Sequence, residues 1–94
     1  MAKYRKKPIV INAFQWNGNL TAEEKTFPDW FKFTLKSGGI AFEYAGSSES
    51  IISIDTLEGT MRAEPTDWII QGVKGEIYPC KNDIFLATYE KVEE

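Results

Sequence analysis

Apolar and polar residues alternate with a period of two along much of the chain, a pattern typical of β-strands that bury one face. Four short runs with this pattern follow one another in the second half of the sequence, separated by turn residues such as Gly, Pro and Asp. The runs are 50–56, 60–63, 68–71 and 76–80. Because short strands joined by tight turns usually pair with their neighbours, we expect these runs to form an antiparallel meander.

Three further segments have the composition of strands. Residues 9–16 are rich in β-branched and aromatic side chains, with Pro8 at the entrance, where the missing N–H costs no ladder bond. Residues 40–44 alternate, with Ile40, Phe42 and Tyr44 on one side. Residues 88–92 are predicted to form a final edge strand, closing on the first strand.

Two segments carry helix signals. In residues 28–36, Pro28 suits the first helical turn, Asp29 and Lys36 complement the helix dipole, and a Ser-Gly-Gly sequence ends the element. Its aromatic residues form a wide apolar face that is expected to pack on the sheet. Residues 82–87 are predicted to form one or two helical turns capped by polar residues. The polar segment 20–27 is expected to be a surface connection.

These elements together predict an α+β fold. We expect a mainly antiparallel, curved sheet of about 5–7 short strands, or a small barrel, with the helix at about 28–36 on one face and the helical turn at about 82–87. The 94 residues suit a single domain spanning 1–94, since a chain of this length cannot divide its core between two centres.

The charge is distributed unevenly along the chain. Residues 1–7 form a basic N-terminal arm with four of the eleven Lys and Arg residues, which leaves seven basic against fourteen acidic residues in the body. An acidic body disfavours nucleic acid as a partner, although the arm keeps that alternative open. The single cysteine, Cys80, and the lack of an apolar stretch of transmembrane length predict a cytoplasmic protein without a membrane anchor.

The sequence contains no histidine, which removes the usual general base and the commonest metal ligand. We therefore predict no catalytic residue, no metal and no cofactor, and lean towards a protein that is not an enzyme. A hydrolase or metal-dependent enzyme built on acidic residues is a further alternative; its candidates are Asp55, Glu58, Asp67 and Glu76. Asp67 is more simply a turn residue, and Cys80 a small packing residue.

The meander also carries a candidate binding set, in which aromatic rings lie beside charged groups that suit a planar or anionic ligand. Its members are Arg62, Trp68, Lys74, Glu76 and Tyr78. For Trp68, packing against Phe85 or Trp16 is the favoured interpretation.

Segments at both ends of the chain carry a resemblance to a known family; they are residues 4–16, 56–61, 67–81, Phe85 and 88–90. These segments resemble a family of small proteins encoded by bacteriophages and prophages of Gram-positive and other bacteria. The family often has Pro-Gly-Asp-aromatic where this chain has Pro65-Thr66-Asp67-Trp68, and Thr in place of Gly makes a positive φ at position 66 unexpected.

The resemblance implies a phage-encoded accessory protein at work in the host cytoplasm. We expect a non-enzymatic binding module that acts on a host protein, with inhibition of a host defence as one form of that role. The alternative is a small-ligand binder, for example for a nucleotide signal, using Arg62, Lys74 and an aromatic residue. A homodimer through an edge strand is compatible with either function.

Overall fold

The computed structural model describes residues 1–5 and 7–92. Its strands are β1 (Asn12–Gln15), β2 (Ile40–Glu43), β3 (Ile51–Thr56), β4 (Gly59–Ala63), β5 (Trp68–Gln71) and β6 (Ile77–Cys80). Its helices are α1 (Leu20–Glu23), the 3-10 turn η1 (Glu24–Thr26), α2 (Asp29–Lys36) and α3 (Asn82–Thr88). The predicted α+β class with antiparallel pairing is confirmed, and so are the two predicted helices.

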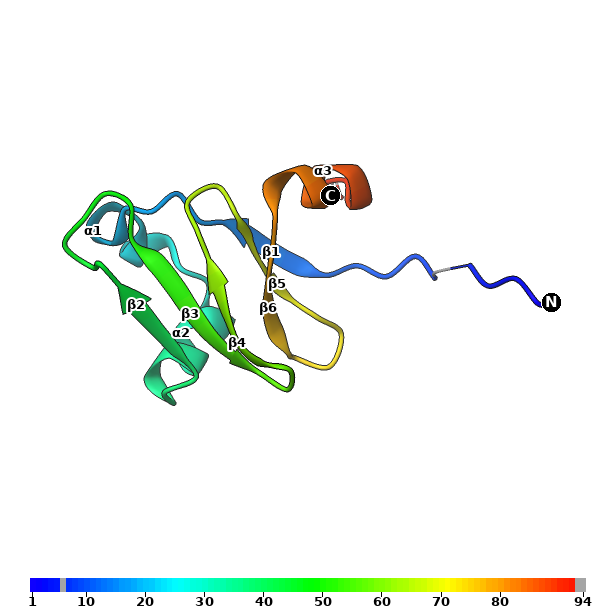
Figure 1. Cartoon of the computed structure of the whole chain (residues 1–94), viewed down its shortest axis with the longest axis horizontal. Coiled ribbons are helices and arrows are strands. Elements are labelled where there is room, and N and C mark those ends of the chain that lie inside the picture. Colours follow the sequence, from blue (N-terminus) through cyan, green and yellow to red (C-terminus); the bar gives the residue numbers. More distant parts are fainter. Residues whose placement is uncertain (6, 93–94) are drawn as a thin grey trace.

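The strands form two three-stranded antiparallel sheets, with orders β1-β5-β6 and β2-β3-β4 (Figure 1). The expectation of one continuous meander from residue 50 to residue 80 was therefore wrong, because β4 does not pair with β5. The amide of Trp16 donates to the carbonyl of Asp67 at 2.8 Å, and the amide of Thr66 donates to the carbonyl of Trp16 at 2.6 Å. These bonds hold the start of β5 against β1, away from β4.

The inner faces of the two sheets enclose the main core together with α2. The core includes Trp16, Phe31 and Ile52, each fully buried. Phe14 packs edge-on against Phe31, with ring centroids 5.1 Å apart. The apolar face predicted for α2 packs only in part, since Phe33 is 75% exposed.

The first sheet also buries part of its other face. The register places Trp68 and Ile70 opposite Cys80 and Tyr78, on the side away from the main core. Helix α3 covers this side, and Phe85 of α3 stacks on Trp68 with ring centroids 4.0 Å apart. The predicted contact between Trp68 and Phe85 is confirmed.

Three sequence-based boundaries require correction. Residues 20–27 contain α1 and η1, where only a connection was expected. Asn19 caps α1 by accepting a hydrogen bond from the Ala22 amide, and the Glu23 carboxylate accepts from the Asn19 amide, a reciprocal cap that fixes this short helix. Residues 88–92 do not form the predicted edge strand, because α3 extends to Thr88 and no strand follows it among the described residues. The first strand begins at Asn12 and not at Ile9.

The turn between β4 and β5 adopts a conformation that the sequence argued against. The Asp67 amide donates to the Glu64 carbonyl at 2.9 Å, Pro65 occupies the second position, and Thr66 has φ +80°. A positive φ at the third position is typical of a type II turn and is normally supplied by Gly. The turn is retained with Thr because bonds to Trp16 and to the Asp67 side chain fix both of its ends.

Candidate binding surface

The outer face of the sheet β2-β3-β4 is an open pleated surface. Side chains that point away from the core come from all three strands, and the register aligns Ala41, Ser53 and Arg62 across them. Ala41, Asp55, Thr60 and Arg62 are exposed. In Figure 1, no helix lies in front of these strands. This face is therefore available to a partner.

Arg62 of β4 reaches across this surface to Glu43 of β2. Its Nε donates to Glu43 Oε2 at 3.0 Å and one terminal nitrogen donates to Oε1 at 3.2 Å, which makes a bidentate pair. The Ser53 hydroxyl donates to the same Oε2 at 2.7 Å. This hydrogen bond from Ser53, more than the guanidinium of Arg62, lowers the pKa of Glu43 from its usual value, although partial desolvation opposes it. The carboxylate thus stays charged and fixes the guanidinium.

Two large exposed side chains lie in the segments that follow β2 and β3. Tyr44 follows β2 directly, is 67% exposed and has φ +58°. Leu57, in the turn between β3 and β4, is fully exposed. A non-glycine residue at positive φ is energetically unfavourable, and such residues gather at functional sites. The sheet therefore carries a fixed Arg, a residue type enriched where protein partners bind, and the segments that follow β2 and β3 expose Tyr44 and Leu57.

Of the five residues predicted to form a binding set, Trp68 and Tyr78 lie beneath α3. The Trp68 indole N–H donates to Asn82 Oδ1 at 2.8 Å. Burial raises the pKa of Tyr78 to about 12, with a further contribution from its hydrogen bond to Tyr89. Both side chains anchor the helix to the sheet, so the structure gives them packing partners on the opposite side of the molecule from the outer face of β2-β3-β4.

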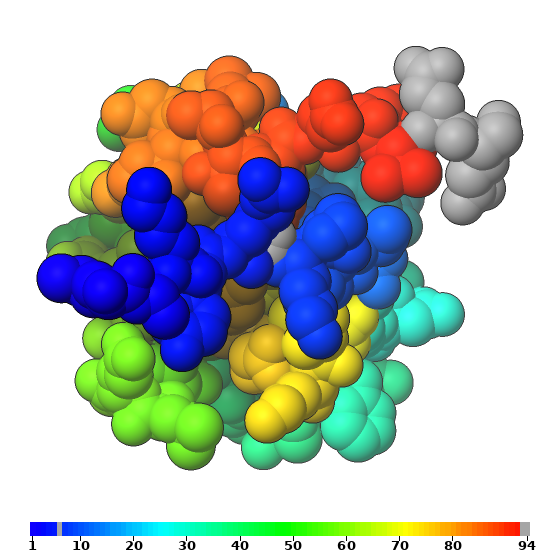
Figure 2. Space-filling view, turned by 90° about the vertical axis from the view of Figure 1, so that its right-hand side faces the viewer, coloured from blue at the N-terminus to red at the C-terminus, as the bar shows by residue number. Residues whose placement is uncertain are grey.

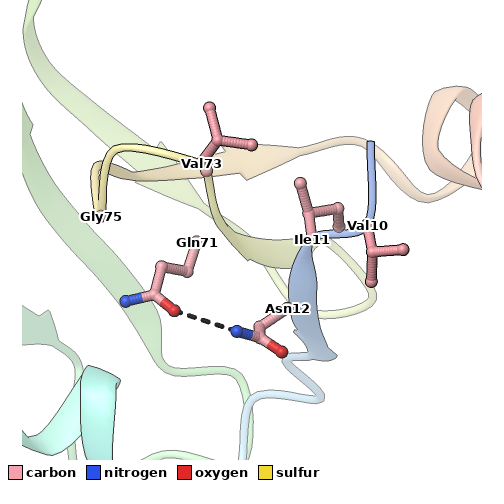
Figure 3. A pocket seen from close by; sticks show the side chains of 7 residues that line it. Val10, Ile11, Asn12, Gln71, Val73 and Gly75 are labelled. Carbon is pink, nitrogen blue, oxygen red and sulfur yellow. Dashed lines mark hydrogen bonds between the residues drawn. The ribbon is translucent and has the colours of Figure 1, made fainter. Parts of the chain in front are cut away.

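Besides Arg62, the remaining members of the predicted binding set are Lys74 and Glu76. Both lie in or next to the Gly72–Gly75 turn and are exposed. The Glu76 carboxylate lies where a side chain at position 72 would be. An open pocket of about 450 Å³ lies beside this turn, between it and residues 10–12 (Figure 3). Val10, Ile11, Asn12, Gln71 and Val73 are among its lining residues, and none of the five candidates is. The structure therefore does not bring Arg62 together with the other four.

Two of the four acidic residues considered for catalysis, Asp67 and Asp55, have local hydrogen-bond partners. Asp67 is 4% exposed; its carboxylate accepts the Glu64 amide at 2.9 Å and the Lys81 ammonium at 3.0 Å. Asp55 accepts the Thr60 hydroxyl at 3.0 Å. The hydrogen bond to Asp67 raises the pKa of Lys81. The interpretation of Asp67 as a turn residue is confirmed.

Cys80 is half-buried at the end of β6, and desolvation raises the pKa of its thiol, so the neighbouring lysines do not activate it. Across residues 1–5 and 7–92, no three side chains of the metal-binding types gather into a group that could hold an ion. No helix in that same part of the chain is long and apolar enough to cross a membrane.

Sequence reasoning missed Glu43 and Ser53 as parts of the surface around Arg62. The alternation in residues 40–44 and 50–56 assigns Glu43 and Ser53 to the solvent side of their strands, which is the available signal. Their pairing with Arg62 depends on the order β2-β3-β4, which places residues 19 positions apart side by side.

Comparisons with known proteins give limited context for this α+β chain. No family model matches it, and no solved structure matches it. It is similar to a 4-alpha-glucanotransferase of Thermotoga neapolitana, with 25% identity over 93 residues. The match covers 97% of this chain and 21% of that protein, so the chain spans about a fifth of the length of the curated relative it matches.

Proposed function

We propose that this chain is a phage-encoded accessory protein that binds a host protein through the outer face of β2-β3-β4, without catalysing a reaction. The observation that carries this proposal is the guanidinium of Arg62, fixed by Glu43 and Ser53 on an uncovered sheet face. The resemblance of both ends of the chain to phage proteins supports the setting.

The geometry suits protein recognition for an energetic reason. Binding normally costs side-chain entropy, about 0.5–1.5 kcal/mol for each immobilised flexible residue. Because Arg62 is already fixed by Glu43, less of this cost remains to be met on binding. A guanidinium has five N–H donors, and the pair with Glu43 uses two of them, so donors remain for a carbonyl or carboxylate of the partner.

The experiment compares the wild type with Arg62→Glu in capture from host lysate, followed by affinity measurement with the purified captured protein. We expect Arg62→Glu to weaken binding at least tenfold, because it places two carboxylates together at the centre of the surface. Lys74→Glu makes the same change of charge outside this surface and is expected to bind like the wild type.

Thermal unfolding of each variant controls for misfolding, since an exposed ion pair contributes only about 0–1 kcal/mol. Equal affinities for Arg62→Glu and the wild type would place the binding surface elsewhere. If no host protein saturates the wild type, the function itself is refuted.

The similarity to the glucanotransferase favours a second candidate, the binding of an α-glucan. Exposed aromatic rings are the side chains that stack on sugar faces, and Tyr44 and Phe33 are 67% and 75% exposed. Electrophoresis through a gel containing soluble glycogen tests this candidate. Retardation that Tyr44→Ala abolishes would support it, and unchanged mobility of the wild type would exclude it.

The nucleotide alternative requires Arg62 and Lys74 to act with Trp68 or Tyr78. These residues do not lie on one common surface in the structure. Thermal shift against a panel of nucleotides tests it directly, because any ligand that binds the folded state stabilises it. An unchanged melting temperature with every member at millimolar concentration would eliminate this function.

A further inference from the structure

The N-terminal segment contains strand-forming residues that have no pairing strand. Residues 9–11, Ile-Val-Ile, have high β-propensity, yet the ladder between β1 and β5 begins only at Asn12. Its partner β5 ends at Gln71, where the chain turns back through Gly72–Gly75. Ile9 is 47% exposed and Val10 is 73% exposed. In Figure 1 the chain before β1 extends away from the body, and in Figure 2 it lies in front, on the side that faces the viewer.

Strand β1 is also an outer strand of its sheet. The amide of Trp16 donates towards β5, so backbone groups of the even-numbered residues point towards β5 and those of Ala13 point towards the open edge. If the strand continues in the same direction, the backbone groups of Ile9 and Ile11 face this edge as well. No strand among the described residues pairs with it, and unpaired edges of this kind favour strand addition.

The open edge of β1 in one copy can pair with residues 9–11 of a second copy. When two such strands lie antiparallel with Asn12 opposite Asn12, Ile11 of one copy pairs with Ala13 of the other, and Ile9 pairs with Gln15. These are the residues whose backbone groups face the open edge, so every outward-facing group between residues 9 and 15 gains a partner. The two sheets then join into one six-stranded sheet across a two-fold axis.

The distribution of charge favours a second copy of this chain as the occupant. The arm carries Lys3, Arg5, Lys6 and Lys7, whereas the rest of the chain has seven basic and fourteen acidic residues. Pairing in this register directs Lys3 and Arg5 of one copy beyond Gln15 of the other, towards its α1 and η1, and Glu24 of η1 is exposed. Opposite charges therefore meet in both halves of the symmetric pair, which assists association.

We propose that two copies of this chain form a homodimer in which β1 and residues 9–11 of each copy pair antiparallel about Asn12. This inference is independent of the surface around Arg62, which lies on the other sheet. A host strand that adds to the same edge is the competing occupant, and the mass of the purified protein distinguishes the two.

The test is light scattering of the purified protein combined with cysteine cross-linking in a Cys80→Ser background, which removes the only native thiol. We expect a mass twice 10.7 kDa. Asn12→Cys is expected to form a disulfide between copies under mild oxidation, because directly opposed residues in a non-hydrogen-bonded pair have Cα atoms about 4.5 Å apart.

Ile11→Cys is the matched control. In this register the two copies of residue 11 are diagonal neighbours, about 7–8 Å apart or more, which exceeds the span of a disulfide. A monomeric mass at every concentration overturns the homodimer. A dimer in which Asn12→Cys fails to cross-link, or in which Ile11→Cys cross-links equally well, overturns this interface.

Discussion

At the scale of single residues, two backbone conformations determine how segments distant in the sequence meet. Gly18 has φ +93°, its carbonyl accepts the Ser50 amide at 2.9 Å, and the Trp16 indole donates to the Ser50 carbonyl at 2.7 Å. Thr66 has φ +80° in the turn that leads into β5. The glycine adopts its conformation without strain, whereas the threonine is strained.

Replacing Thr66 with Gly is expected to stabilise the protein. Relief of the strain at positive φ, about 1–3 kcal/mol, exceeds the additional entropy of an unfolded Gly, about 0.4–1 kcal/mol. We expect a net gain of about 1 kcal/mol and a rise in melting temperature of roughly 4–8 °C, measured by calorimetry. Thr66→Ala retains a Cβ and should gain less. A lower melting temperature for Thr66→Gly would contradict this account of the turn.

Replacing Gly18 with Ala is expected to destabilise the protein by about 3 kcal/mol, measured by urea denaturation. A Cβ at this position would lie 2.7 Å from the Ser48 carbonyl oxygen and 2.8 Å from Pro65 Cγ, in a conformation that Ala adopts poorly. Gly46→Ala is the control, because a Cβ there meets nothing within 4 Å. Equal stability of the two variants would show that the loop adjusts freely around Gly18.

At the scale of elements, α3 is attached to the first sheet by an aromatic cluster. Phe85 lies between Trp68, with ring centroids 4.0 Å apart, and Tyr89, with centroids 5.0 Å apart. Asn82 Oδ1 accepts hydrogen bonds from Trp68 and from the Gln15 side chain. A helix of seven residues is too short to be stable alone, so this packing accounts for its formation.

Phe85→Ala is therefore expected to detach α3 from the sheet, at a cost of about 3 kcal/mol in the free energy of unfolding. Hydrogen exchange should show faster exchange of the α3 amides in this variant. Leu86→Ala removes a side chain that is 63% exposed and should change stability by less than about 0.5 kcal/mol. Equivalent effects of the two substitutions would mean that the stack on Trp68 does not hold the helix.

At the scale of the whole molecule, stability should depend on pH in the alkaline range. The pKa of Tyr78 rises from 10.0 to about 12 on folding, chiefly through burial, so the folded protein holds this proton more tightly than the unfolded chain. The associated stability is complete below pH 10 and decreases as the pH rises through about 12. The raised pKa of Lys81 acts in the same direction.

Tyr78→Phe should weaken this alkaline loss of stability, because it removes one of the two groups. The measurement is the urea midpoint as a function of pH for both proteins, together with absorbance titration of the tyrosines. Lys81→Met should remove the other part. If the wild type and Tyr78→Phe lose stability in parallel above pH 10, Tyr78 does not contribute to the effect.

Some helices and strands could be predicted from the sequence, and others could not. Local signals predicted α2, α3 and the strands, because the period of the apolar residues and the capping residues act within a few positions. The strand 68–71 matches β5 in full. The prediction of an edge strand at 88–92 was wrong because a strand forms only where it finds a pairing strand, whereas α3 continues through Thr88 and Tyr89 stacks on Phe85. The helix α1 was missed because its stability comes from the reciprocal cap between Asn19 and Glu23.

The residues of the candidate surface also differ in how far the sequence predicted their neighbours. Arg62, Trp68 and Tyr78 were grouped together on the assumption that their strands belong to one sheet. The strands occupy two sheets, so Arg62 meets Glu43 and Ser53, whereas Trp68 and Tyr78 meet α3.

The sequence by itself determined the α+β class, the helices α2 and α3, the approximate positions of the six strands, and the acidic body with its basic arm, because these depend on local periodicity and on composition. Only the tertiary structure decided that the strands divide into two sheets, that Thr66 adopts a positive φ, and that Arg62 is fixed on an open face. These features depend on which strands pair, and hydrogen bonds between residues about 50 positions apart, such as those joining Trp16 to Thr66 and Asp67, select that pairing.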